Sequence, residues 1–260
     1  MAKINRLKIE AGGIEIIESG KLYGNMNTAK EFFPEGCSEE LRKKIFLDNR
    51  LALGRDYGFD GNKMFMADQK DKTGTWFEID EEYVEANPKG WSDIDQDILI
   101  VTDKTPGVVI GHPVADCPVV MAYDKKNKVA AICHCSANLV DIKMPEKVID
   151  ALCEAYDSKT RDVVAYISAS AGSSWTYDCY PKWAKDEEFW SKYIKLEKDG
   201  LYHISLKSAV LMQLIDRHVG EIYMNPVDTI TDPLYYSNSA GREDESKRGR
   251  NFSGTYFVKK

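Results

Sequence analysis

Two short runs in the middle of the chain carry the side chains best suited to chemistry. Asp116 and Cys117 precede the apolar run 118–124, and His134 ends the next apolar run, 129–134. If these runs form a hairpin about residues 125–128, Cys117 and His134 become neighbours at one end of a sheet. A thiol and an imidazole within reach form either a thiolate nucleophile with its base or two soft zinc ligands. In the first arrangement, Asp116 would orient the imidazole.

His112 is a further candidate, because it lies five residues before Cys117 on a run that should end near the same place. It would supply a second imidazole, or it would simply mark a strand terminus at His112-Pro113. A structural interpretation also stands for the main pair. Cysteine is common in buried strands as a small hydrophobe, and an isolated histidine often only satisfies a local hydrogen bond. Cys135 should face away from His134 and belong to the core.

The elements around these residues are predicted from apolar periodicity. Four apolar, β-rich runs fill the centre, and their nearly continuous apolar character indicates strands covered on both faces. Asn127 suits a left-handed position in the hairpin turn. A helix should begin at a Ser38 cap and reach about Leu53, with Leu41, Ile45 and Phe46 on one face. The other expected elements are a strand pair about Gly12-Gly13, short strands at 63–67 and 75–79, a loop or short helix ended by Pro88, helices at 144–157, around 184–194 and about 205–218 (with Leu206, Val210, Leu214 and Ile215 on one face), and strands at 162–170, 221–226 and 254–260.

This order of elements lacks the regular alternation of a dinucleotide-binding fold. It predicts an α/β fold of mixed β-sheets layered with flanking helices. No internal repeat, low-complexity tract or Pro/Ser-rich linker interrupts the chain. Residues 1–260 are therefore expected to form a single domain.

Composition excludes several classes of protein. The net charge of −7 argues against general nucleic-acid binding, though not against a small anion held by local donors. No apolar run approaches the ~20 residues of a membrane span, and the charged N-terminus does not resemble a signal peptide. A cytoplasmic protein without membrane association is expected. The six cysteines include no CxxC pair, so they are expected to be reduced.

The string VADCPVVMAYDKKNKVAAICHCSANLVDI resembles the central signature of the YfiH-like laccase-domain family. In that family a T-A-D-C-x-P-V-L-L strand leads through a hairpin to V-A-A-V-H-A-G-W-R-G. Cys117 matches the family cysteine, and His134 matches the histidine of the second motif. Weaker similarities follow in order along the chain. They include GNMNTA and DNR near the N-terminus, AYISASAGSSWTYDCY with Tyr177 near the family tyrosine, and the C-terminal TDPLYYSNSAGREDESKRGRNFSG.

The resemblance implies a single α/β domain with a site of two histidines and one cysteine, often with bound zinc. It also implies phosphorolysis of adenosine, inosine, guanosine and methylthioadenosine, and deamination of adenosine. The partners would be a small nucleoside and phosphate. The candidate substrate contacts are Asn27, Gln69, Tyr177 and Arg250. Nothing in the chain resembles the His-x-His motifs of multicopper oxidases.

The chain departs from the family at two important places. The Q-V-H-G motif, which holds the first histidine, corresponds to Gln69-Lys70-Asp71-Lys72, so Asp71 replaces that ligand. The H-A-G-W-R-G turn reads His134-Cys135-Ser136-Ala137-Asn138-Leu139, and Asn138 replaces an arginine suited to clamping phosphate. Arg242 and Arg250 are the remaining candidates for anion contacts. Asp71 is otherwise a solvated loop charge.

Three functional interpretations remain open. The first is an enzyme whose metal ligands are Cys117, His134 and either Asp71 or His112. The second is a thiol hydrolase in which Cys117 is the nucleophile, His134 the base and Asp116 the orienting group. The third is a catalytically degenerate relative that serves as a binding protein. The survival of Asp116, Cys117 and His134 favours a phosphorylase-type enzyme.

Overall fold

The computed structural model describes residues 7–9, 13–67, 72–90 and 94–259, and for residues 7–9 the backbone alone. Its strands form three sheets. The five-stranded sheet has the order β1-β2-β14-β6-β3, with β1 at Leu7–Ile9, β2 at Ile14–Glu18, β14 at Asn251–Phe257, β6 at Val109–Val114 and β3 at Met64–Met66. The six-stranded sheet has the order β13-β9-β7-β8-β5-β4, with β13 at Glu221–Met224, β9 at Val163–Ile167, β7 at Val119–Asp124, β8 at Val129–His134, β5 at Ile98–Thr102 and β4 at Trp76–Glu78.

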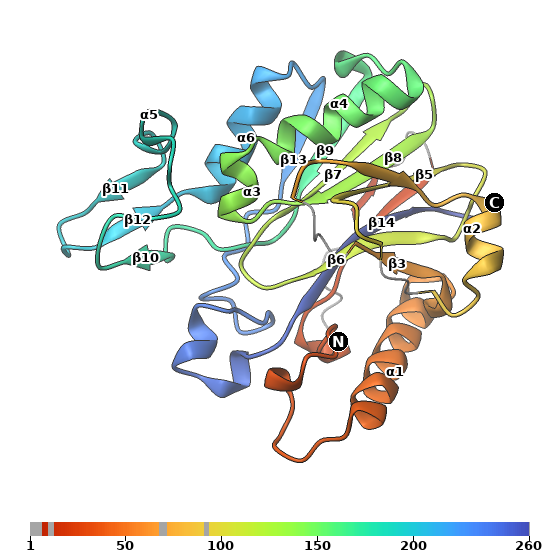
Figure 1. The fold of residues 1–260 in the computed structure, drawn as a ribbon, viewed down its shortest axis with the longest axis horizontal. Helices are drawn as coiled ribbons and strands as arrows, with labels where there is room; N and C mark the ends of the chain where they lie inside the picture. Colours follow the sequence, from red (N-terminus) through yellow and green to blue (C-terminus); the bar gives the residue numbers. More distant parts are fainter. Residues whose placement is uncertain (1–6, 10–12, 68–71, 91–93, 260) are drawn as a thin grey trace.

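The two large sheets pack face to face between layers of helix (Figure 1). Helix α1 (Glu39–Tyr57) covers the outer face of the five-stranded sheet, and α3 (Ala137–Asp141), α4 (Met144–Tyr156) and α6 (Leu206–Asp216) cover that of the six-stranded sheet. The short helix α2 (Glu81–Ala86) ends before Pro88, as predicted. The predicted mixed-sheet α/β fold is therefore confirmed.

The central strands show why their sequences are nearly continuously apolar. On β7, Val119, Met121 and Tyr123 enter the core between the two sheets, whereas Val120 and Ala122 enter the core beneath the helices. Strand β8 alternates in the same way. Ala130 and Ile132 face the other sheet, and Cys133 faces the helices. Both faces are buried, so neither needs polar residues.

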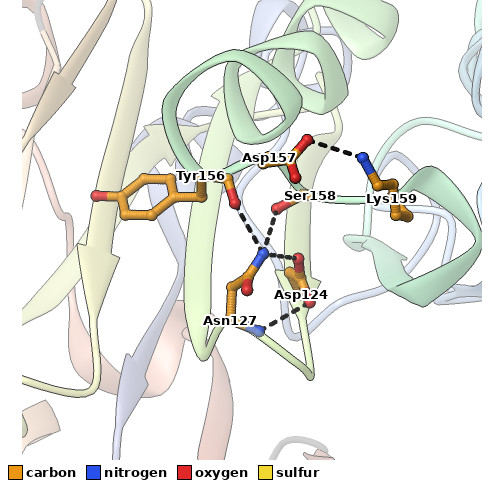
Figure 2. A network of polar contacts seen from close by, with 6 residues as sticks. All are labelled: Asp124, Asn127, Tyr156, Asp157, Ser158 and Lys159. Carbon is orange, nitrogen blue, oxygen red and sulfur yellow. Dashed lines mark hydrogen bonds and ion pairs between the residues drawn. The ribbon is translucent and has the colours of Figure 1, made fainter.

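The β7–β8 hairpin turn is held by side chains rather than by the expected left-handed asparagine (Figure 2). The prediction for Asn127 is wrong, since Lys128 takes the positive φ of 54°. Asn127 instead donates from Nδ2 to Asp124 Oδ2 at 2.9 Å and to the Tyr156 carbonyl at 2.9 Å. Its side chain thereby ties the turn to the end of α4, a role that depends on tertiary contacts and not on local sequence.

Helix α1 begins as predicted, with Ser38 Oγ accepting from the Leu41 amide at 3.2 Å. Its buried face differs from the prediction. Phe46 is buried, but Leu41 is 48% exposed and Ile45 is only half-buried. The face continues instead to Leu53 and Tyr57, past the expected end. Likewise, Ile215 on α6 is exposed rather than on the buried face with Leu214.

A third sheet projects from the body of the molecule as an arm (Figure 1). It has the order β10-β12-β11, with β10 at Thr176–Tyr177, β12 at Tyr202–Ile204 and β11 at Ile194–Leu196. The helix predicted around 184–194 is largely wrong, because only α5 (Glu187–Trp190) is helical. Aromatic contacts hold the arm, including Trp175 stacked on Trp183 with ring centroids 5.8 Å apart. Among the described helices, none combines the length and the apolar composition that a membrane span requires.

Candidate functional site

The two histidines meet because facing strands of the two large sheets present them to each other. His112 shares the face of β6 that carries Ile110 and Val114, which lies against the six-stranded sheet. His134 shares the face of β8 that carries Ala130 and Ile132, which lies against the five-stranded sheet. Their ring centroids are 6.0 Å apart. His112 and His134 therefore form a pair between the sheets.

The environment keeps both imidazoles neutral. His112 is 2% exposed, and its Nε2 has no hydrogen-bond partner among the described residues. Burial, reinforced by the nearby His134, lowers the pKa of His112 well below its usual value. Burial and the positive charge of Arg250 lower the pKa of His134 to about 4. Neutral imidazoles are the form that ligates metals or accepts protons.

Cys117 lies in the loop between β6 and β7, beside the end of β8. Its neighbour Pro118 accepts a hydrogen bond from the Cys135 amide at 2.8 Å, which joins this loop to the residue after His134. Burial, followed by the charge of Asp116, raises the pKa of Cys117 to about 12, although Arg250 opposes the shift. Burial and the charge of Asp116 therefore disfavour the free thiolate, for the nucleophile and the metal-ligand interpretations alike. Cys135 is buried in the core beneath the helices, on the face away from His134.

Asp116 holds a loop in place. Its Oδ1 accepts from Thr229 Oγ1 at 2.8 Å, and its Oδ2 accepts from Ser237 Oγ at 3.0 Å and from the Ser239 amide at 2.7 Å. Asp116 also adopts a left-handed φ of 77°, which aspartate tolerates better than most residues. The predicted role of orienting His134 has no support in these contacts. They make Asp116 a positioning residue for the segment 229–239.

That segment leads into a cavity lined by arginines. The cavity, about 190 Å³ in volume, is lined by Glu31, Phe32, Ser237, Asn238, Gly241, Arg242, Arg248, Gly249 and Arg250. We call it the arginine cavity. Arg250 is half-buried and lies over the Phe32 ring at 4.4 Å. Burial lowers the pKa of Arg250, and Cys117 and Asp116 oppose that shift. The guanidinium therefore lies within electrostatic reach of both Cys117 and His134.

The other predicted site residues are placed differently. Asn27 closes a local turn, since its Oδ1 accepts from the Ala29 amide at 2.7 Å. It also lies next to the site, because Asn25 bonds the Asn27 carbonyl and accepts from the Arg250 amide at 2.8 Å. Tyr177 belongs to β10 of the arm and lines a separate cavity. Gln69 and Asp71 lie outside the described residues.

The described side chains include donor atoms that suit a metal ion, but they do not form a complete set of ligands. The Nε2 of His112, which has no partner among the described residues, and the imidazole of His134 are ligands that zinc accepts. Within the described ranges, no group of three or more His, Cys, Asp or Glu side chains is arranged to hold an ion. The pair of imidazoles fits two coordination positions.

Sequence reasoning missed the residues that build the arginine cavity around Arg250. Ser237, Arg248 and Phe32 lie far from Cys117 in the chain, in segments of mixed polar composition. Asp116 offered a signal, because a buried carboxylate beside a site needs several donors. The identity of those donors depends on the folding of the segment 225–250, which has little regular structure.

Comparison with known proteins agrees with this architecture. A family model described as multi-copper polyphenol oxidoreductase laccase matches residues 36–257. The fold is similar to the Bacillus licheniformis hypothetical protein YfiH, with 19% sequence identity over 95% of this chain and 93% of that chain and a TM-score of 0.72. It is also similar to YlmD from Geobacillus stearothermophilus, with 14% identity over 95% and 93% of the two chains and a TM-score of 0.74.

A Neisseria meningitidis protein is also similar, with 14% identity over 98% of this chain and 100% of that chain and a TM-score of 0.69. No curated protein sequence matches the chain significantly. The family model covers most of the chain, and it includes every described element that forms the histidine pair and the arginine cavity except Glu31 and Phe32. The chain therefore belongs to the multi-copper polyphenol oxidoreductase laccase family, as a YfiH-like member.

Proposed function

We propose that this protein is an enzyme of the purine nucleoside phosphorylase type, acting on adenosine, inosine, guanosine or related nucleosides. The observation that carries the proposal is the arginine cavity, which is lined by Arg242, Arg248 and Arg250. Adenosine deamination at the same site is a further reaction of this proposal. The cellular location that we propose is the cytoplasm.

The arginine cavity is suited to the inorganic phosphate that phosphorolysis requires. Arg242, Arg248 and Arg250 all line it, in a chain whose overall charge is −7. The three arginines would therefore attract a phosphate although the net negative charge of the chain repels anions. Arginine binds phosphate through two parallel N–H donors, which fixes the orientation of the anion as well as holding it. Arg250 is the arginine that we propose for the clamp, since Asn138 stands in place of the family's arginine.

The reaction needs the chain mainly to orient the two substrates. An oxygen of hydrogen phosphate forms a bond to C1′ of the sugar while the C1′–N bond to the purine breaks. The purine leaves with the electron pair and takes on nitrogen the proton that the phosphate loses, giving the free base and the sugar 1-phosphate. Arg250 would hold the attacking phosphate, and the neutral His134 would hydrogen-bond the sugar.

We propose zinc as the metal, held by Cys117, His134 and a third ligand that is His112 or Asp71. His112 is the candidate with structural support, because its ring centroid lies 6.0 Å from that of His134 and its buried Nε2 has no partner among the described residues. When bound, the ion would polarise an oxygen or nitrogen of the substrate. The protein would shape the site and exclude water from it.

The test is phosphate-dependent release of hypoxanthine from inosine. We expect release that requires inorganic phosphate and yields one sugar 1-phosphate per base. In Arg250→Met the apparent KM for phosphate should rise at least tenfold. Arg55→Met is the matched control, since Arg55 is exposed on α1 far along the chain from the site. Equal KM values for phosphate in the two variants would contradict the role of Arg250, and hypoxanthine release without phosphate would identify a hydrolase instead.

Two substitutions favour the alternative of a non-catalytic binding protein. Asp71 stands where the family has its first histidine, and Asn138 stands where the family has an arginine. In that case the arginine cavity would bind an anionic ligand without turnover. Nucleoside or phosphate binding by a protein that releases no purine would support this alternative.

A further inference from the structure

A second, larger cavity lies between the arm and the segment that follows β13. Its volume is about 660 Å³, and we call it the arm cavity. Its lining residues are Ser174, Trp175, Thr176, Tyr177, Asp178, Ile230, Ser239, Ala240, Arg242, Glu243, Asp244 and Lys247. Aromatic side chains come from the arm, and charged side chains come mainly from the opposite segment. Such a cavity is large enough for a small organic ligand.

The arm cavity and the arginine cavity share a wall. Arg242 lines both of them. Ser237 lines the arginine cavity and Ser239 lines the arm cavity, and Asp116 binds both of these serines. The residue next to Cys117 therefore sets the position of both cavities. A ligand that extends from one cavity into the other would contact two walls that are both positioned by the buried Asp116 carboxylate.

The arm is fixed firmly enough to form a binding wall. Ser174 Oγ donates to Asp228 Oδ2 at 2.6 Å, and Gly172 approaches Asp228 so closely that a β-carbon would lie 2.5 Å from Oδ2. The Trp175 ring stacks parallel to the Trp183 ring, and the ring centroids of Tyr177 and Trp175 are 5.7 Å apart. These contacts hold the two rings at the cavity in defined positions.

We propose that the arm cavity is the subsite for the planar ring of the substrate, with Tyr177 and Trp175 as its stacking surface. Aromatic side chains stack on heteroaromatic rings of every kind. The charged residues opposite suit the mixed donors and acceptors on the edge of such a ring. Bonds from Ser246 lower the pKa of Asp244, so its carboxylate is ionised and can accept from an N–H group on the edge of the ring. This inference rests on the proposed function in that the ring would be the purine.

The chemistry of the two cavities is complementary. The arginine cavity would hold the phosphate and the arm cavity the base, with the sugar at the wall that they share. Arg242 is exposed and belongs to both cavities, so it is positioned to contact a ligand in either. The arm thereby determines which bases are accepted, while the segment 237–250 binds the anion.

The test measures binding of free hypoxanthine by calorimetry, without phosphate and without turnover. Tyr177→Leu should weaken binding about tenfold or more, whereas Tyr177→Phe, which keeps the ring, should bind as the wild type does. Tyr180→Leu is the matched control, because Tyr180 is a half-buried arm tyrosine packed on Tyr202 and is not among the residues that line the cavity. Thermal unfolding of each variant checks that the arm remains folded.

The outcomes separate this inference from the proposed function. Equal hypoxanthine affinity in Tyr177→Leu and Tyr180→Leu, or no hypoxanthine binding by the wild type, overturns the subsite even if phosphate-dependent purine release is observed. Binding that is lost in Tyr177→Leu alone, in a protein that releases no purine, supports the subsite while contradicting the phosphorylase.

Discussion

Replacing Asp116 by Asn tests whether this carboxylate holds the arginine-bearing segment. Asparagine tolerates the left-handed φ of 77°, so the backbone should not be strained by the change. The amide oxygen can take the place of Oδ2 and keep accepting from Ser237 Oγ and from the Ser239 amide. The NH₂ group then takes the place of Oδ1, where the Thr229 hydroxyl must accept instead of donate.

The expected loss follows from these contacts. The neutral amide of Asp116→Asn loses the charge that strengthens the bonds from Ser237 and Ser239, so the free energy of unfolding should fall by about 1–3 kcal/mol. Asp116→Ala removes all three bonds, and we expect a loss of about 3–5 kcal/mol. Urea denaturation measures both losses. Hydrogen exchange of residues 237–250 should also become faster in each variant, because the attachment of this segment to the β6–β7 loop is weakened or lost.

Asp157→Asn is the matched control for these measurements. Asp157 also has a positive φ, of 51°, but it is exposed at the end of α4. Its substitution should change the unfolding free energy by less than about 0.5 kcal/mol. The reasoning is refuted if Asp116→Asn is as stable as Asp157→Asn and hydrogen exchange in residues 237–250 is unchanged.

Three further predictions concern the core. Burial raises the pKa of Glu18 from 4.5 to about 7, so the folded protein keeps a proton that the unfolded chain releases; the free energy of unfolding should fall by about 3 kcal/mol as pH rises from about 4.5 to 7 and then stop falling from this source. Denaturation at pH 5 and pH 8 measures this fall, and a profile as steep in Glu18→Gln would contradict it. A β-carbon on Gly111 would lie 2.0 Å from Phe252 Cζ, so Gly111→Ala should destabilise by about 1–3 kcal/mol, and Phe252→Leu in the same chain should offset part of this loss in thermal unfolding. Leu152→Ala, at a fully buried position, should cost about 2–5 kcal/mol, whereas Leu41→Ala, at a position 48% exposed, should cost less than about 0.5 kcal/mol; similar losses in the two would refute the assigned burial.

The strands that carry the histidine pair were predictable because they are buried on both faces. Runs such as Val119–Asp124 and Val129–His134 leave no alternative to interior strands, and their hairpin register follows from the short turn. The proximity of His112 to His134 required one further fact that the sequence does not contain. The two strands belong to different sheets, and the packing of those sheets depends on contacts across the whole molecule.

The parts that were wrong or missed depend on tertiary contacts. Leu41 fits a helical stripe, but the sheet covers α1 only from Phe46 onward. The sequence around Trp190 has helical periodicity, yet its aromatic rings pack against one another in the arm, and the helix ends after one turn. The segment 225–250 has almost no periodicity, so its attachment to Asp116 could not be read in advance.

The most direct test of the account is metal content together with purine release, measured on the wild type and on Cys117→Ala in parallel. Mass spectrometry of the purified protein distinguishes zinc from copper, and an inosine assay with and without phosphate measures turnover. The account predicts about one zinc per chain and phosphate-dependent hypoxanthine release in the wild type, with both lost in Cys117→Ala. A wild type that binds no metal and releases no purine would contradict the proposed enzyme.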